Sequence, residues 1–360
     1  MDVNKIKENI SNIKNKKSKF IFFVPEIIEP TASIYEIFFH AHIMKKEGYD
    51  VRILINGENK EKPYWIEDEI LDVEIELASD VKLKVGADDV VIIPEILTNV
   101  FEQTKNIPSI RVGFLQSIDY MFNALLPGGT WKQLGVNNII TTSNKLKELV
   151  QNTMGSNYNF YTYDIGIPEY FKNKVTNKLP IIPIVFRNKN DIMKIVKMFY
   201  LKYPQYSWVS FDGMVYDNDS TKQLARKDFA EKLDKSFAAI WIDKISSFGT
   251  FPLECMKTKT IPIGLIPDIF PEYLDIETDK NLGYWTTNIY QIPEMIANAI
   301  NNYLEDTKLL EEFGKDCEYF SDKYTQDNSE KQLINIYTEL LNKRVNILEE
   351  HIKKIEEDEK

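Results

Sequence analysis

Short runs of β-branched and aromatic residues alternate with stretches of helical periodicity along most of this chain. The apolar runs occupy residues 20–24, 51–55, 90–93, 110–114 and 139–142, and a second series occupies 181–186, 208–211, 238–242 and 261–263. Such runs, separated by helical segments, are typical of parallel strands covered by helices. Because 360 residues exceed one ordinary hydrophobic core, the sequence predicts an α/β protein with two similar Rossmann-like halves.

The first half opens with a strand, a helix and a strand over residues 20–55, which is a Rossmann-like arrangement. Ser33 and Glu36 are spaced as a capping box at the start of the expected helix, and Gly48 follows its last apolar residues. The pattern therefore predicts a helix that begins at Ser33 and ends before Gly48.

Composition divides the chain into four expected parts. We expect a polar helical extension over 1–17, Rossmann-like domains over 18–172 and 173–325, and a C-terminal helix over 326–360. Gly, Pro, Asn and Lys mix near 163–180, which predicts the link between the domains. The last helix carries apolar residues every three or four positions and is predicted to lie on its own protein. A coiled-coil surface that makes homo-oligomers is the alternative.

Charge and cysteine content exclude some classes of protein. The net charge of -11 opposes long-range attraction to nucleic acid, although a local basic cleft stays open. Cys255 and Cys317 alone make no disulfide framework or metal pair, which fits a reducing compartment. We expect a cytoplasmic chain, since the N-terminus has no secretory pattern and no run reaches the roughly 18 apolar residues of a membrane span.

The stretch 238–264 combines two apolar runs with a turn that could bind a ligand. A strand that turns into a helix through Ser-Ser-Phe-Gly presents backbone N–H groups, which favour an anion such as phosphate. Gly249 permits a close approach to the backbone, and the Glu254 carboxylate can accept hydrogen bonds from a ribose diol. The alternative is that Glu254 only complements the helix dipole.

The segment "SSFGTFPLECMKTKTIPIG" resembles the donor-binding segment of retaining glycosyltransferases of the GT-B architecture. Further segments are similar in the same order: "GYDVRILI", "NNIITTSNKLKELV", "IGIPEYF" and "IPIVFRNKNDIMKIVKMFYLKYP". The resemblance covers about residues 20–340. It implies two Rossmann-like domains that face each other across a cleft, with the acceptor on the first and a nucleotide-sugar on the second.

The resemblance also implies roles for individual residues of the donor site. Glu254 would bind the ribose, and Arg187 and Lys189 would hold the diphosphate, whose charge needs cations or N–H donors. The backbone of Phe248 and Gly249 would lie beside the sugar and the phosphates. The neighbouring hydroxyl residues Ser247 and Thr250 are included in this donor site.

Three positions depart from the family pattern. Ser246 stands where the family has the first of its two glutamates, and the nearby Asp243 is a candidate to reach the same space. The glycine pair expected after the first strand is replaced by "PTAS", residues 30–33. A histidine expected near the catalytic edge of the first domain is missing, and Gln116, with Asp119 nearby, stands there. We therefore treat Ser246, Asp243 and Gln116 as the candidate catalytic residues.

The implied reaction moves a hexose from a UDP- or GDP-sugar to an acceptor hydroxyl with retention of configuration and without a resident cofactor. The acceptor expected from the family is a surface polysaccharide or a glycolipid. A modified DNA base, as in some phage enzymes, is one alternative. A catalytically silent relative that binds a nucleotide or a partner, and an epimerase-like relative, are others.

Two further motifs are interpreted as structural, so no metal site is expected. Asp217 and Asp219 form an Asp-x-Asp pattern in a polar stretch that is typical of a solvated loop. His40 and His42 lie two residues apart on one helix, which directs them to opposite flanks of its apolar stripe.

Overall fold

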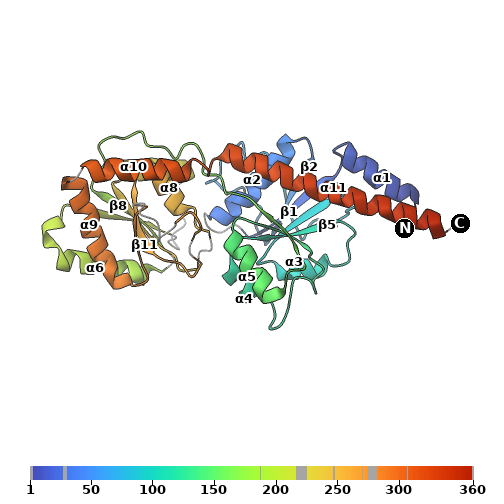
Figure 1. The fold of residues 1–360 in the computed structure, drawn as a ribbon, viewed down its shortest axis with the longest axis horizontal. Coiled ribbons are helices and arrows are strands. Elements are labelled where there is room, and N and C mark those ends of the chain that lie inside the picture. The colour runs from blue at the N-terminus through green and yellow to red at the C-terminus, as the bar shows by residue number, and fades with distance from the viewer. Residues whose placement is uncertain are drawn as a thin grey trace. The chain divides into compact units, whose positions relative to one another are not determined.

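The structure is a computed structural model of the chain, shown in Figure 1. It describes residues 3–26, 31–186, 188–215, 225–245, 248–269, 271–274, 282–305 and 307–358. The chain divides into two compact units, one made of residues 1–163 with 330–360 and the other of residues 164–329. The units group the chain slightly differently from the expected ranges, because residues 164–172 belong to the second unit and most of the last helix to the first.

The first unit is built on a seven-stranded sheet in which every strand pairs in parallel. The strand order is β3-β2-β1-β4-β5-β6-β7. Its strands are β1 (Lys19–Pro25), β2 (Asp50–Asn56), β3 (Glu74–Leu77), β4 (Val90–Pro94), β5 (Ile110–Leu115), β6 (Asn138–Thr141) and β7 (Asn159–Thr162). Its helices are α1 (Val3–Lys14), α2 (Ala32–Lys46), α3 (Thr98–Gln103), α4 (Ile118–Ala124), α5 (Asn144–Met154) and, from residue 330 on, α11 (Gln326–Asp358).

Helices from the two ends of the chain complete the core of the first unit. Ile6, Ile10 and Ile13 of α1 are buried in the same hydrophobic cluster as β1, α2 and α11. The helices α1 and α11 lie side by side (Figure 1), and Lys14 and Glu349 form an ion pair of 3.1 Å between them. The expected polar extension is therefore a helix whose apolar face belongs to the core.

The apolar stripe of α11 lies against its own unit, as the amphipathic pattern predicts. Tyr337, Leu341, Val345 and Leu348 are buried in this core, and Ile334, Ile352 and Ile355 pack against it. These contacts use the face that a coiled-coil partner would need.

The start of α2 differs from the predicted capping box. Thr31 is the N-cap, and its hydroxyl accepts a hydrogen bond of 3.1 Å from the backbone N of Ile34. Glu36 does not reach back to the helix start, because its carboxylate is buried and accepts a hydrogen bond of 2.9 Å from the Tyr163 hydroxyl. The predicted box of Ser33 and Glu36 was wrong, since the interior contact takes the carboxylate.

The second unit is built on a five-stranded parallel sheet of order β12-β11-β10-β8-β9. Its strands are β8 (Ile181–Phe186), β9 (Ser210–Val215), β10 (Ala238–Ile242), β11 (Ile261–Leu265) and β12 (Tyr284–Thr286). Its helices are α6 (Lys189–Lys202), α7 (Arg226–Lys235), α8 (Phe251–Lys257), α9 (Ile292–Glu305) and α10 (Thr307–Ser321), with the short 3₁₀ turns η1 (Pro204–Tyr206) and η2 (Ile289–Gln291).

Both sheets have a point where the strand order reverses. In the first sheet the reversal lies between β1 and β4, and in the second it lies between β8 and β10. Open parallel α/β sheets bind their ligands outside the carboxyl ends of the strands at this point. The residues that follow β1, β4, β8 and β10 are therefore the candidates for ligand binding.

Gly166 tests how tightly the segment 164–171 packs within the second unit. A Cβ at Gly166 would lie 2.7 Å from the Cα of Gln326, a backbone atom that cannot move aside cheaply. We expect Gly166→Ala to lower the free energy of unfolding by about 1–3 kcal/mol, measured by urea denaturation. Gly314→Ala is the matched control, because its Cβ would meet only the flexible Lys259 side chain at 3.4 Å. A Gly166 variant as stable as the Gly314 variant would contradict the close packing.

Candidate functional site

The carboxyl ends of β8 and β10 lie next to each other in the second sheet. Phe186, the last residue of β8, pairs with Ile242, the last residue of β10. Both strands therefore end at the same edge of the sheet. Arg187 lies outside the described residues, and Lys189 is the first residue of α6. Asn188 caps this helix, because its Oδ1 accepts a hydrogen bond of 2.9 Å from the backbone N of Asn190.

The first residues after β10 form a local side-chain hydrogen bond. Asp243 accepts a hydrogen bond of 3.2 Å from the backbone N of Ile245, which closes the turn locally. Ser246 and Ser247, two of the predicted site residues, lie outside the described residues. Gly249 has a φ of 65°, a left-handed conformation that side chains disfavour, and this explains a glycine before α8. Thr250 is the N-cap residue of α8, and its side chain makes no capping hydrogen bond.

An aromatic cluster holds Phe248 and Gly249 in place. The Phe248 ring lies 5.3 Å from the Tyr273 ring and 6.2 Å from the Tyr324 ring, measured between centroids. The Tyr273 hydroxyl donates hydrogen bonds to the carbonyl oxygens of Phe248, at 3.4 Å, and Gly249. Burial raises the pKa of Tyr273 well above its usual value, so this donor keeps its proton. The Phe248 side chain therefore belongs to the hydrophobic core of the second unit.

Glu254 lies in the first turn of α8 and forms an ion pair that the sequence did not reveal. Its Oε1 accepts a hydrogen bond of 2.7 Å from Nη2 of Arg226, the first residue of α7. Their side chains are only 6% and 10% exposed. The guanidinium carbon of Arg226 also lies 5.7 Å from the centre of the Phe171 ring. A carboxylate has about four acceptor positions, so this pair orients Glu254 while leaving capacity for a diol.

Polar residues also gather at the carboxyl edge of the first sheet. Gln116, the predicted catalytic residue of this unit, follows β5, and its Nε2 donates a hydrogen bond of 3.0 Å to the carbonyl of Ser33. The next residue, Ser117, donates its backbone N–H to Oε1 of Glu95, at 2.8 Å. Glu95 directly follows β4 and is buried. Sequence reasoning missed Glu95, although a lone carboxylate after a wholly apolar strand was a usable signal.

Comparisons with known proteins relate this chain to others by structure. No protein-family model matches the chain, and no curated protein matches it in sequence. A glycosyltransferase from Rickettsia africae ESF-5 is similar with a TM-score of 0.62 and 12% identity, over 90% of this chain and 99% of that chain. The Anabaena protein Alr3699/HepE in complex with UDP and glucose is similar with a TM-score of 0.63 and 12% identity, over 89% of this chain and 100% of that chain. The pneumococcal O-GlcNAc transferase GtfA in complex with UDP and GlcNAc is similar with a TM-score of 0.58 and 11% identity, over 93% of this chain and 99% of that chain.

This chain has a GT-B-like fold. The predicted fold class is confirmed: two parallel sheets of seven and five strands, with their helices, and a long C-terminal helix. The GT-B-like fold places the predicted residues Asp243, Glu254 and Lys189 in the second unit and Gln116 in the first.

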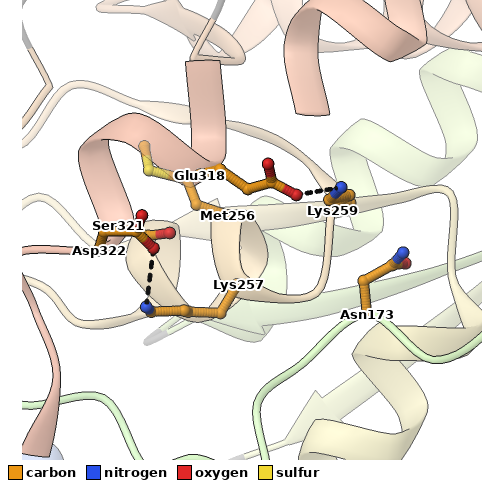
Figure 2. A pocket seen from close by; sticks show the side chains of 7 residues that line it. All are labelled: Asn173, Met256, Lys257, Lys259, Glu318, Ser321 and Asp322. Carbon is orange, nitrogen blue, oxygen red and sulfur yellow. Dashed lines mark ion pairs between the residues drawn. The ribbon is translucent and has the colours of Figure 1, made fainter. Parts of the chain in front are cut away.

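A pocket of about 190 Å³ lies elsewhere in the second unit of this GT-B-like chain (Figure 2). It is lined by Asn173, Met256, Lys257, Lys259, Glu318, Ser321 and Asp322. Lys257 pairs with Asp322 at 3.9 Å and Lys259 with Glu318 at 2.5 Å, so the charges balance within the pocket. The pocket adjoins the last turn of α8, whereas Glu254 lies in the first, and it is not the predicted donor site.

The remaining motifs make no metal site in the part of the chain that the structure describes. No three side chains of His, Cys, Asp or Glu come together there to hold a metal ion. His40 is buried and hydrogen-bonds to the Tyr337 hydroxyl at 2.9 Å, while His42 is half-buried. Asp217 and Asp219 lie outside the described residues. None of the described helices combines the length and apolar character that crossing a membrane requires.

Proposed function

We propose that this chain is a glycosyltransferase that moves a hexose from a nucleoside-diphosphate sugar to an acceptor hydroxyl. The observation that carries the proposal is the buried Glu254 in the first turn of α8. This helix follows Gly249 and β10, and β10 is one of the two strands between which the order of the second sheet reverses. Two of the similar structures contain UDP together with a sugar, which supports UDP as the nucleotide.

In this proposal the second unit binds the donor. Glu254, held by Arg226, accepts hydrogen bonds from the ribose hydroxyls, and the backbone of Phe248 and Gly249 lies beside the phosphates and the sugar. Arg187 and Lys189, which come after β8 in the sequence, are proposed to supply the positive charge that a diphosphate leaving group needs. Asp243 and Ser246 are the candidate residues for contact with the transferred sugar.

The proposed chemistry retains the configuration of the anomeric carbon. The bond from the anomeric carbon to the diphosphate oxygen breaks, and the acceptor oxygen bonds to the same face of that carbon. The acceptor proton passes to the departing diphosphate oxygen, so no side chain has to act as the base. Gln116 belongs to the acceptor side, and the acceptor is a saccharide, free or as part of a polysaccharide or glycolipid.

Donor binding is tested by calorimetric titration of the protein with UDP, GDP, UDP-glucose and UDP-N-acetylglucosamine. We expect one nucleotide to bind and Glu254→Gln to weaken it at least tenfold, because an amide is a poorer acceptor for the ribose diol and its NH₂ group only donates. Glu231→Gln on α7 is the matched control, since its side chain is 67% exposed and should leave the affinity unchanged.

Turnover then separates the transferase from a silent nucleotide-binding relative, which the serine at position 246 favours. Release of UDP from the bound donor, with transfer or slow hydrolysis of the sugar, supports the enzyme. Binding without release of UDP supports the silent relative, and the absence of any nucleotide binding contradicts both.

A further inference from the structure

Glu95 occupies the position in the first sheet that corresponds to a ligand site in parallel α/β folds. It directly follows β4, and β4 and β1 are the strands between which the strand order reverses. Phe22 of β1 pairs with Ile92 of β4, so both strands end at the same edge. The carboxyl group of Glu95 thus lies where such sheets bind ligands.

The two oxygens of this carboxyl group have different surroundings. Oε1 accepts the hydrogen bond from the backbone N of Ser117, at 2.8 Å. Oε2 is buried and has no hydrogen-bond partner among the described residues, although Glu95 as a whole is only 3% exposed. A buried polar atom without a partner costs about 1–3 kcal/mol, which a ligand that supplies the partner would recover.

The protonation state of Glu95 determines what Oε2 can offer a ligand. Burial raises the pKa of Glu95 from 4.5 to about 8, and the backbone N–H groups of Glu95, Ser117 and Gln116 lower it. The carboxylates of the adjoining segments are Glu26 after β1 and Asp119 in α4. At neutral pH the group is therefore an uncharged acid, with an O–H at Oε2 that can donate one hydrogen bond.

We infer that Glu95 donates a hydrogen bond from Oε2 to a hydroxyl oxygen of the saccharide acceptor bound at the carboxyl edge of the first sheet. The inference rests on the proposed function, because it assigns the acceptor to this unit. Glu95 then orients the acceptor sugar and takes no proton from it. Gln116, the neighbour of Ser117, belongs to the same edge and is fixed by Ser33.

A purely structural role for Glu95 makes different predictions. If Glu95 only linked the segments after β4 and β5, its replacement would change the stability of the protein. The affinity for a sugar would then not change with the protonation state of Glu95. Glutamine keeps an oxygen for Ser117 and an N–H donor for the ligand, whereas leucine keeps neither. The pair of variants therefore separates hydrogen bonding from packing.

The test measures binding of glucose and N-acetylglucosamine by ligand-observed saturation-transfer NMR with UDP present, at pH 7 and pH 9. We expect Glu95→Leu to weaken sugar binding at least tenfold at pH 7, and Glu95→Gln to stay within about threefold of the natural protein. At pH 9 the natural protein should bind about tenfold more weakly, since about one tenth of Glu95 then keeps its proton. Glu95→Gln should bind equally at both pH values.

Glu102→Leu, an exposed position on α3, is the control for a leucine in this unit, and circular dichroism reports whether each variant folds. If Glu95→Leu does not fold, the pH comparison between the natural protein and Glu95→Gln decides alone. Equal sugar affinity at pH 7 and 9 in the natural protein, or no sugar binding at all, would overturn the inference. UDP calorimetry and donor turnover report on the proposed function separately, so the two failures are distinguishable.

Discussion

Replacement of Arg226 by methionine is expected to lower the free energy of unfolding by about 3–5 kcal/mol. Arg226 and Glu254 form a buried pair at 2.7 Å, and removing one partner leaves the other charge buried without compensation. The methylene part of methionine still packs beside Phe171, so the loss reports mainly on the charge. Urea denaturation followed by far-UV circular dichroism measures it.

The double variant Arg226→Met with Glu254→Met is expected to recover most of this loss. A buried ion pair replaced by apolar side chains of similar volume is often neutral or stabilising, because neither charge then has to be desolvated. Lys232→Met, whose charge pairs with Asp212 and whose side chain is 29% exposed, is the control and should cost much less.

The double variant also decides between the two interpretations of Glu254. If Glu254 binds the donor ribose, the stable double variant fails to bind a nucleotide that the natural protein binds. If Glu254 only balances Arg226, the double variant binds that nucleotide as tightly as the natural protein does. The latter result would remove Glu254 from the proposed donor site without changing the fold.

The sequence predicted the central strands well and the strands at the sheet edges poorly, for a physical reason. β1, β4 and β10 lie inside their sheets and are mostly continuous apolar runs, because both faces are covered, and β5 differs only by the buried Arg111. Of the edge strands, β3, β7 and β12, with sequences EIEL, NFYT and YWT, were not predicted, whereas β9 (Ser210–Val215) overlaps the strand predicted over 208–211. Their exposed positions admit polar residues, so a neighbouring strand and not their own pattern identifies them.

The site was predictable only where its residues are close in sequence. Gly249 and Glu254 fall within one segment, and a family pattern could identify them together. Arg226 lies 28 positions before Glu254 and is paired with it by the packing of α7 against α8, which no local pattern encodes. Glu36 shows the opposite case, since its spacing from Ser33 predicted a helix cap that a buried tyrosine hydroxyl overrides.

Two buried groups of the first unit are expected to give its stability opposite dependences on pH. Burial lowers the pKa of His40 from 6.5 to about 3, and its Nε2 has no hydrogen-bond partner among the described residues. The groups around it are Tyr337, which shares a hydrogen bond with Nδ1, and Tyr163, whose hydroxyl is bonded to Glu36. Between pH 6.5 and 3, His40 is protonated in the unfolded chain and neutral in the folded chain. The free energy of unfolding therefore falls as the pH falls.

Glu95 gives the stability the opposite dependence on pH, because folding raises its pKa from 4.5 to about 8. Between these values the folded chain holds a proton that the unfolded chain releases, so stability falls as the pH rises. Each contribution changes by about 1.4 kcal/mol per pH unit, and the two overlap between pH 4.5 and 6.5. Their contributions to the natural protein should nearly cancel in that window.

Variants that lack one of the two groups should therefore show a slope of the free energy of unfolding against pH that is nearly absent in the natural protein. From pH 5 to 6.5, His40→Gln is expected to lose about 2 kcal/mol of stability as the pH rises, and Glu95→Gln about 2 kcal/mol as the pH falls, each relative to the natural protein. Urea denaturation at several pH values measures the slopes, and hydrogen exchange of β1 and β4 peptides assigns them to the first unit. His42→Gln on the same helix is the control for replacing a histidine of this unit by glutamine. A variant that keeps the natural slope would mean that the replaced group titrates in the folded protein as it does in the unfolded chain. The double variant, which removes both groups, should return to the natural slope at a lower stability, because the cancellation depends only on the two protons.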